Sequence, residues 1–134
     1  HLHRGYACSD RCDFGCEEVA VAPSGRLYPC ERLVGEDDRD DLVIGHVDSG
    51  IDPARRDALV ATKNQVRPDC AACALLDRCM HWCGCVNQAL TGSVGEVSGL
   101  LCWFEQQVIE QADRCAGVLH EEGCEGFRRR FYVG

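Results

Sequence analysis

The sequence lacks several features that would place it in common functional classes. No apolar run reaches the length of a membrane-spanning helix, and the N-terminal stretch His1-Leu2-His3-Arg4-Gly5 has no apolar signal core. The formal net charge of −8 is opposite to the basic balance of a nucleic-acid binder. We therefore expect one cytoplasmic domain, residues 1–134, that binds neither nucleic acid nor a membrane.

Large apolar residues are also scarce, with 4 Phe, 2 Trp and 1 Met among 134 residues. Cysteine, in contrast, is abundant, with 12 residues. In a reducing compartment, clustered cysteines are more often metal ligands than disulfides. Bound metal can then supply much of the folding free energy, as structural zinc does at about 10–16 kcal/mol per site. From the beginning at His1, without Met, we expect a domain boundary or a fragment.

Seven of the cysteines form one spaced array. They are Cys12, Cys30, Cys70, Cys73, Cys79, Cys83 and Cys102, with Gly25 in a Gly-x4-Cys unit before Cys30. The four between 70 and 83 could close a single zinc site. They could instead be shared between two iron–sulfur clusters, which would also use the three distant cysteines. Two all-cysteine clusters need eight thiolates, so the eighth comes from Cys8, Cys16 or Cys85; we favour Cys16, which lies between Cys12 and a predicted hairpin.

The pattern of the chain predicts a small, irregular α+β fold. A β-hairpin is expected over residues 17–30, a strand over 42–47, and a helix capped by Asp52 that runs to about residue 65. The acidic run 36–41 reads as a solvated loop. A C-terminal helix starts near Ser98 and is followed by a basic, aromatic tail, which we expect to be solvated, with a docking strand for a partner as the alternative. The apolar stripe expected on that helix is Leu101, Phe104, Val108, Ala112, Cys115 and Leu119.

This array resembles the SPASM domain, the auxiliary-cluster domain of many radical SAM enzymes. That family has a Cys, roughly nine to fifteen residues, Gly-x4-Cys, then Cys-x2-Cys-x5-Cys-x3-Cys and a final Cys; the chain meets every fixed spacing. The segment Pro23-Ser24-Gly25-Arg26-Leu27-Tyr28-Pro29-Cys30 is similar to the family's hairpin, and Val43-Ile44-Gly45-His46-Val47 to its strand. The resemblance covers about residues 12–110, and Cys12-x-x-Gly15 makes maturases of ribosomally made peptides the most similar members.

The resemblance implies a fold in which the hairpin, short helices and C-terminal helix are organised around two [4Fe-4S] clusters. It implies electron transfer and positioning of a precursor peptide, with a radical SAM core domain as partner in cis or in trans. Cys8 is an alternative ligand, and some relatives leave one iron of the first cluster open. The implied ligands are Cys12, Cys16, Cys30 and Cys83 for the first cluster, and Cys70, Cys73, Cys79 and Cys102 for the second.

The chain departs from the parent enzymes in one respect. Its Cys8-x3-Cys12-x3-Cys16 is one residue longer than the Cys-x3-Cys-x2-Cys that holds the S-adenosylmethionine-cleaving cluster. We therefore expect no catalytic residue here and S-adenosylmethionine only in a separate core domain. The alternatives are a zinc-stabilised interaction domain and a disulfide scaffold. Outside the clusters, we expect burial or hydrogen bonding to a ligand for Cys85 and His81, packing around the clusters for Trp82 and Trp103, a core position for Cys115, and a free thiol at Cys124.

Overall fold

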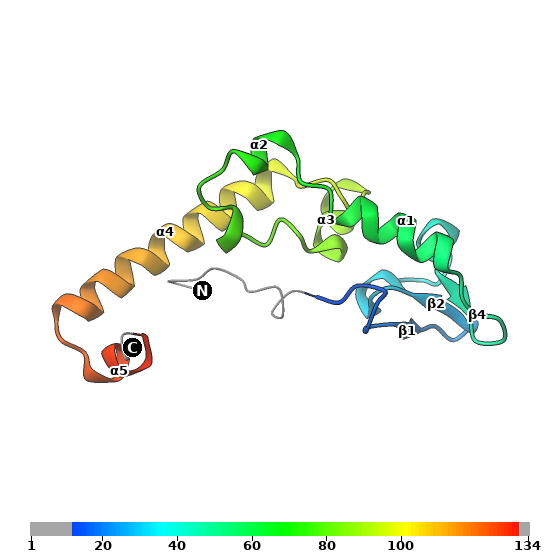
Figure 1. Ribbon diagram of the computed structural model, residues 1–134, viewed down its shortest axis with the longest axis horizontal. Helices are drawn as coiled ribbons and strands as arrows, with labels where there is room; N and C mark the ends of the chain where they lie inside the picture. Colours follow the sequence, from blue (N-terminus) through cyan, green and yellow to red (C-terminus); the bar gives the residue numbers. More distant parts are fainter. Residues whose placement is uncertain (1–11, 132–134) are drawn as a thin grey trace.

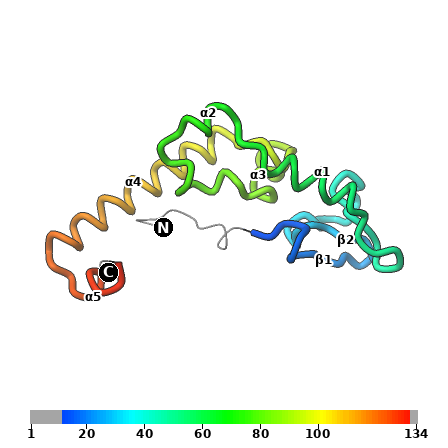
Figure 2. Tube along the Cα trace, viewed as in Figure 1, coloured from blue at the N-terminus to red at the C-terminus, as the bar shows by residue number. Residues whose placement is uncertain are grey.

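The computed structural model describes residues 12–131. It is elongated, with a small sheet and helix α1 (Pro53–Lys63) at one end and the long helix α4 (Gly99–Glu121) reaching away at the other (Figure 1). The cysteine-rich segment lies between these two ends, and the trace follows it through α2 (Pro68–Ala71) and α3 (Gly84–Thr91) (Figure 2). The mixed α+β class expected from the sequence is confirmed.

The sheet has four short antiparallel strands in sequential order: β1 (Ala20–Val21), β2 (Arg26–Tyr28), β3 (Gly45–His46) and β4 (Gly50–Ile51). The predicted hairpin is confirmed, with Ala20 opposite Tyr28. Its turn requires glycine at Gly25, where φ is 89° and an added Cβ would lie 2.6 Å from the His46 ring. The Gly-x4-Cys spacing thus marks the point where the chain turns back toward Cys30.

The strand expected over 42–47 is shorter than predicted. Only Gly45 and His46 pair with β2, and the chain then turns into β4, which the sequence analysis did not anticipate. A Cβ at Gly45 would overlap the carbonyl oxygen of Gly50, so the two strands approach closely only because residue 45 is glycine. Residues before the strand form a short 3₁₀ helix, η3 (Asp40–Leu42).

The acidic run 36–41 is only partly the solvated loop that we expected. Asp37 accepts hydrogen bonds from the Ser24 amide at 3.2 Å and the Tyr28 hydroxyl at 2.9 Å. The pKa of Asp37 is held below its ordinary value, first by a hydrogen bond from the Ser24 side chain and then by those from the Tyr28 hydroxyl and the Ser24 amide. Asp40 forms an ion pair with Arg26 at 2.9 Å. Two of the acidic residues therefore tie the loop to the hairpin.

The helices begin where their capping residues predict. The Asp52 carboxylate accepts from the amides of Ala54 and Arg55 at the start of α1, and the Ser98 hydroxyl accepts from Leu101 N–H at the start of α4. The other helical segments are η2 (Glu31–Leu33), η4 (Leu76–Arg78) and α5 (Glu125–Phe131). Within the described residues, no helix is long and apolar enough to cross a membrane.

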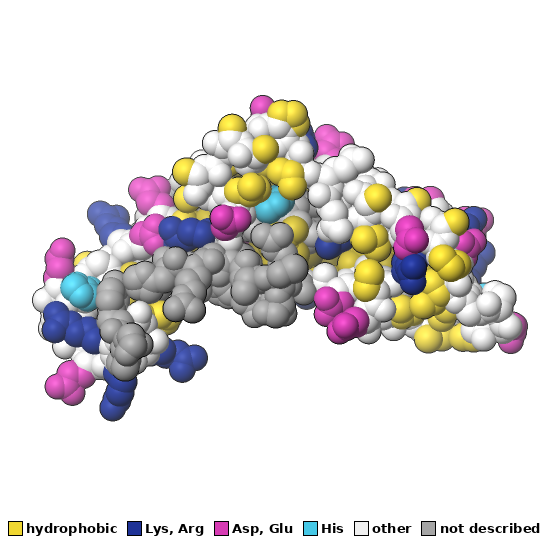
Figure 3. All heavy atoms as spheres, viewed as in Figure 1, with side chains coloured by type: hydrophobic (Ala, Val, Ile, Leu, Met, Phe, Trp, Pro, Cys, Tyr) yellow, Lys and Arg dark blue, Asp and Glu magenta, His cyan; other side chains and the backbone are white. Residues whose placement is uncertain are grey.

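The expectation about which face of the C-terminal helix is buried is wrong. The buried residues of α4 are Leu101, Glu105 and Ile109, whereas the predicted stripe is exposed at Phe104, Val108, Cys115 and Leu119. The reason is that much of α4 extends away from the other elements, so that among residues 12–131 little packs against its outer turns (Figure 1). The tail forms helix α5 as far as Phe131, and its arginines gather at that end of the molecule (Figure 3).

The hydrophobic core joins the hairpin to the start of α3 and includes cysteines. Phe14, Tyr28 and Leu33 are buried together with Leu42 and Val94. Three thiols belong to the same core: Cys30, Cys83 and Cys85, which are 3%, 6% and 8% exposed. The core of this chain is therefore built in part around sulfur.

Candidate metal centres

One group of four cysteines lines a single pocket of about 180 Å³. Cys70 lies in α2, Cys73 just after it, Cys79 follows η4, and Cys102 is in the first turn of α4. Val97 and His81 complete the wall nearest to them. The structure thus brings together all four residues that the resemblance implies for the second cluster, from segments up to 32 positions apart, 102 less 70.

Two contacts hold the cysteine-bearing loop against α4. Arg78 donates two hydrogen bonds to the carboxylate of Asp113, at 2.9 and 2.6 Å. The Met80 amide donates to the buried Glu105 carboxylate at 3.0 Å. Both contacts flank Cys79 in sequence, and both acceptors lie on the helix that carries Cys102. They therefore fix the relative positions of these two thiols.

The sulfurs of this group receive hydrogen bonds. The Leu75 amide donates to Cys73 at 3.4 Å, and the Gln106 side-chain amide donates to Cys102 at 3.2 Å. The backbone amide of His81 donates to Cys79. N–H donors directed at sulfur stabilise thiolate charge and tune the potential of a bound cluster. The donor set, four thiols with N–H groups around them, fits a soft metal or an iron–sulfur cluster.

Burial raises the thiol pKa values in this pocket. It raises the pKa of Cys79 to about 11 and that of Cys70 above its ordinary value. Without metal, Cys70 and Cys79 are therefore neutral at pH 7. A bound metal would have to displace their protons, which is the usual coupling of metal binding to thiol ionisation.

The second group surrounds the buried end of the hairpin. Cys30, Cys83 and the half-buried Cys12 belong to the core or pack against it. Desolvation raises the pKa of each thiol, to about 11 for Cys83. Backbone amides donate to all three sulfurs, from Phe14 to Cys12, Arg32 to Cys30 and Val86 to Cys83. Three of the four residues implied for the first cluster thus lie in one region.

Cys16, the fourth residue implied for the first cluster, is placed differently. Its side chain is exposed and lines a pocket of about 360 Å³ with Cys12, Lys63 and Asn64. Cys30 and Cys83 do not line that pocket. Cys8, the alternative ligand, lies outside the described residues. Among the described cysteines, Cys85 is the one that contacts Cys83, with 3.4 Å between the sulfurs.

Two carboxyl groups that the sequence analysis did not single out lie beside this region. Glu18 lies 3.7 Å from the Cys12 sulfur, and Glu31 lies 3.5 Å from that of Cys30. The carboxyls also hydrogen-bond to each other, which raises the pKa of Glu18 and lowers that of Glu31. Their ligand atoms and the Cys30 sulfur all lie within 4.8 Å of one another. Only the fold reveals the pair, because 13 positions, 31 less 18, separate the two residues.

The remaining side chains that the sequence analysis considered have mixed outcomes. His81 lies at the wall of the first pocket described, and Trp82 packs against the core. Trp103 is 59% exposed, so the expectation that it packs dryly beside a cluster is wrong. Cys115, expected in the core, is also exposed, as is Cys124. All cysteines among residues 12–131 are free thiols.

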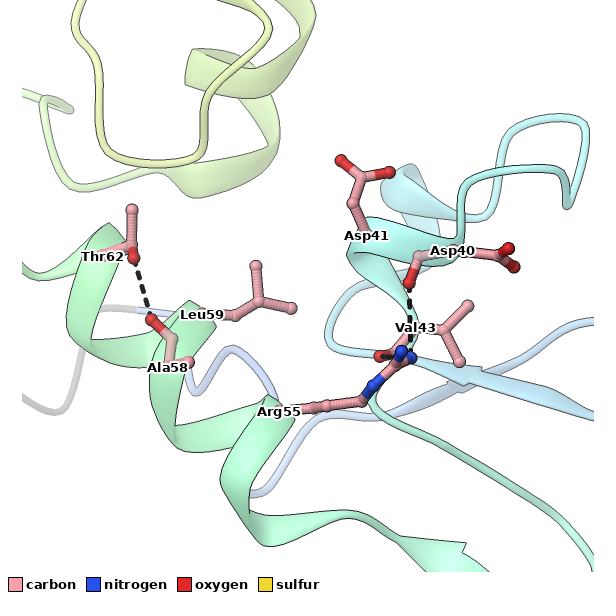
Figure 4. A pocket seen from close by; sticks show the side chains of 7 residues that line it. All are labelled: Asp40, Asp41, Val43, Arg55, Ala58, Leu59 and Thr62. Carbon is pink, nitrogen blue, oxygen red and sulfur yellow. Dashed lines mark hydrogen bonds between the residues drawn. The ribbon is translucent and has the colours of Figure 1, made fainter.

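A third pocket, of about 260 Å³, lies between α1 and η3 (Figure 4). Arg55 reaches across it and donates to the carbonyl oxygens of Asp40 and Val43, at 3.4 and 3.3 Å. Asp41, Leu59 and other side chains line the rest, and no cysteine is among them. These two hydrogen bonds from Arg55 therefore hold α1 against the loop that precedes β3.

A scan of protein-family models, a search of curated proteins and a search of solved structures each find no match to this chain. The functional argument therefore rests on the cysteine geometry. That geometry disfavours the single zinc site considered in the sequence analysis, in which Cys70, Cys73, Cys79 and Cys83 are the ligands. Cys83 is not in the pocket of the other three, where Cys102 stands in its place.

Proposed function

We propose that this chain is an auxiliary iron–sulfur domain that binds two [4Fe-4S] clusters and serves a radical SAM enzyme that modifies peptides. The observation that carries the proposal is the pocket formed by Cys70, Cys73, Cys79 and Cys102. The array resembling the SPASM domain implies these four as one ligand set, although Cys83 is much closer in sequence. The fourth cysteine that lines this pocket is the distant Cys102. This arrangement supports two interleaved clusters over one local zinc site.

The proposed ligands of the first cluster include Cys12, Cys30 and Cys83. They lie in or against the core and accept backbone N–H groups. All-thiolate ligation in buried surroundings supports low reduction potentials. When bound, each cluster supplies a one-electron carrier. The residues hold it, limit its contact with water and stabilise its charge by hydrogen bonds to sulfur.

The two centres differ in exposure, which suits different positions in an electron-transfer path. Cys73 and Cys102 are exposed, so the second centre is accessible to an electron donor or acceptor. Cys30 and Cys83 are buried, so the first centre is insulated by the core. The proposed partners are a radical SAM core domain, in cis or in trans, and a precursor peptide. The proposed setting is the reducing cytoplasm, where thiols remain free to bind metal.

The test is to purify the chain without oxygen and to measure iron, acid-labile sulfide and zinc. We expect about eight irons and eight sulfides per chain, as two four-iron clusters require. Stoichiometric zinc without sulfide would instead identify a zinc-stabilised interaction domain. Either result decides between the two functions.

A variant test addresses the second centre alone. Replacing Cys102 with Ala should remove about four irons and leave the other cluster's electron paramagnetic resonance (EPR) signal intact. The matched control is Cys115→Ala, an exposed cysteine on the same helix, which should keep all of the iron. Equal iron in both variants would refute the assignment of Cys102.

A further inference from the structure

We propose that Cys85, rather than Cys16, supplies the fourth thiolate of the first centre, so that this centre is closed by four protein ligands. The inference rests on the proposed function, because it concerns the ligands of one of its two clusters. It differs from the set implied by the resemblance, in which Cys16 takes this position.

The position of Cys85 among the other thiols is the main argument. Its sulfur lies 3.4 Å from that of Cys83, and it shares the core with Cys30 and Cys83, at 8% exposure. Its thiol also lies near enough to those of Cys12 and Cys30 to interact electrostatically with both. Cys85 therefore contacts Cys83 and Cys30 directly and lies within electrostatic range of Cys12.

The local backbone explains how two thiols separated by one residue come together. Cys83 is the N-cap of α3, and Cys85 lies in its first turn. Gly84 stands between them, where an added Cβ would lie 3.1 Å from both Phe14 and Lys63. The absence of a side chain there lets the start of α3 approach Phe14, close to Cys12. The Cys83-Gly84-Cys85 segment thus presents both sulfurs beside the end of the hairpin.

Cys16 shares a pocket with Cys12 but not with Cys30 or Cys83. It lies in an exposed turn, with its amide donating to the Asp13 carbonyl oxygen at 2.6 Å. The Arg56 guanidinium, which is not part of the cysteine group, interacts electrostatically with Cys16. The carboxyls of Glu18 and Glu31 are nearer to the centre, but they hydrogen-bond to each other, and iron–sulfur clusters are held mainly by thiolates.

A closed first centre has a functional consequence. With four thiolates in place, no iron is left open for a substrate peptide. The first centre would then act in electron transfer, and the peptide would bind elsewhere on the domain or its partner. This separates the chain from those SPASM relatives that leave one iron open.

The experiment compares Cys85→Ala and Cys85→Ser with Cys16→Ala, all purified without oxygen beside the wild type. Iron and sulfide are measured, and EPR spectra of the reduced proteins are recorded with and without added cyanide. The wild type should hold about eight irons and show no response to cyanide. The Cys85 variants should either lose about four irons or gain a cyanide-dependent spectral shift, because one iron is then open. Cys16→Ala should match the wild type in both measurements.

The signal of the second centre serves as the folding control in every variant. If Cys85→Ala loses both centres, the near-isosteric Cys85→Ser decides the question. A change in Cys16→Ala, with both Cys85 variants like the wild type, overturns the inference while leaving the proposed function intact. A wild type without iron and sulfide would instead refute the proposed function itself.

Discussion

At the scale of single residues, a few polar side chains fix the geometry on which the candidate centres depend. Asn87 is an example, since it is 1% exposed and its amide donates to the carbonyl oxygens of His81 and Val94 at 2.9 and 3.3 Å. It thereby joins the cysteine loop to the segment that leads into α4. Such residues are invisible in a cysteine pattern, because their value depends on backbone groups that only the fold brings near.

Glu105 gives a prediction at this scale. Replacing it with Ala should lower stability by about 1–3 kcal/mol, because the Met80 amide loses its buried acceptor. Glu105→Gln keeps an acceptor oxygen and should lose less. The measurement is the thermal unfolding midpoint of the iron-loaded chain. Glu110→Ala, at an exposed position on the same helix, is the control and should change stability by no more than about 0.5 kcal/mol.

At the scale of elements, α4 shows how a correct helix prediction can accompany a wrong burial prediction. The apolar residues at steps of three or four do lie on one helix, and Ser98 does cap it. The buried face of α4, however, is the one that carries Leu101, Glu105 and Ile109. A stripe of apolar residues predicts which side chains share a face, but contact with the neighbouring segments decides which face is covered.

Adjacent residues of α4 test this assignment. Ile109→Ala should cost about 2–5 kcal/mol if the side chain is packed as its 7% exposure indicates. Val108→Ala, at 47% exposure, should stay within about 0.5 kcal/mol. Unfolding midpoints of the two variants give the comparison. A larger loss for Val108 would show that the face predicted from the sequence is the one that is covered.

At the scale of the whole molecule, sulfur takes the place of large apolar side chains in the core. Cys30, Cys83 and Cys85 are buried among only a few large residues such as Phe14 and Tyr28. If these thiols ligate a cluster, then the cluster joins the hairpin, α3 and the segment around Cys12. Metal binding and folding should then be strongly coupled.

Removal of the metal tests this coupling. Treatment of the iron-loaded chain with a chelator under oxidant-free, reducing conditions should lower the unfolding midpoint and weaken the near-ultraviolet circular dichroism of the aromatic core. Reconstitution with iron and sulfide should restore both signals. An unchanged midpoint after complete loss of iron would show that the core is stable without a cluster.

The sequence by itself determined the elements whose causes are local: the hairpin turn at Gly25, the helix caps at Asp52 and Ser98, and the spacing of the cysteine array. The tertiary structure decided which thiols are neighbours. Cys102 lies beside Cys70 because α4 is held against the cysteine loop by Glu105 and Arg78. Cys83 and Cys85 lie near Cys12 because Gly84 lets the start of α3 approach Phe14. Sulfur–sulfur proximity depends on how separate segments pack, and spacing along the chain does not specify that packing.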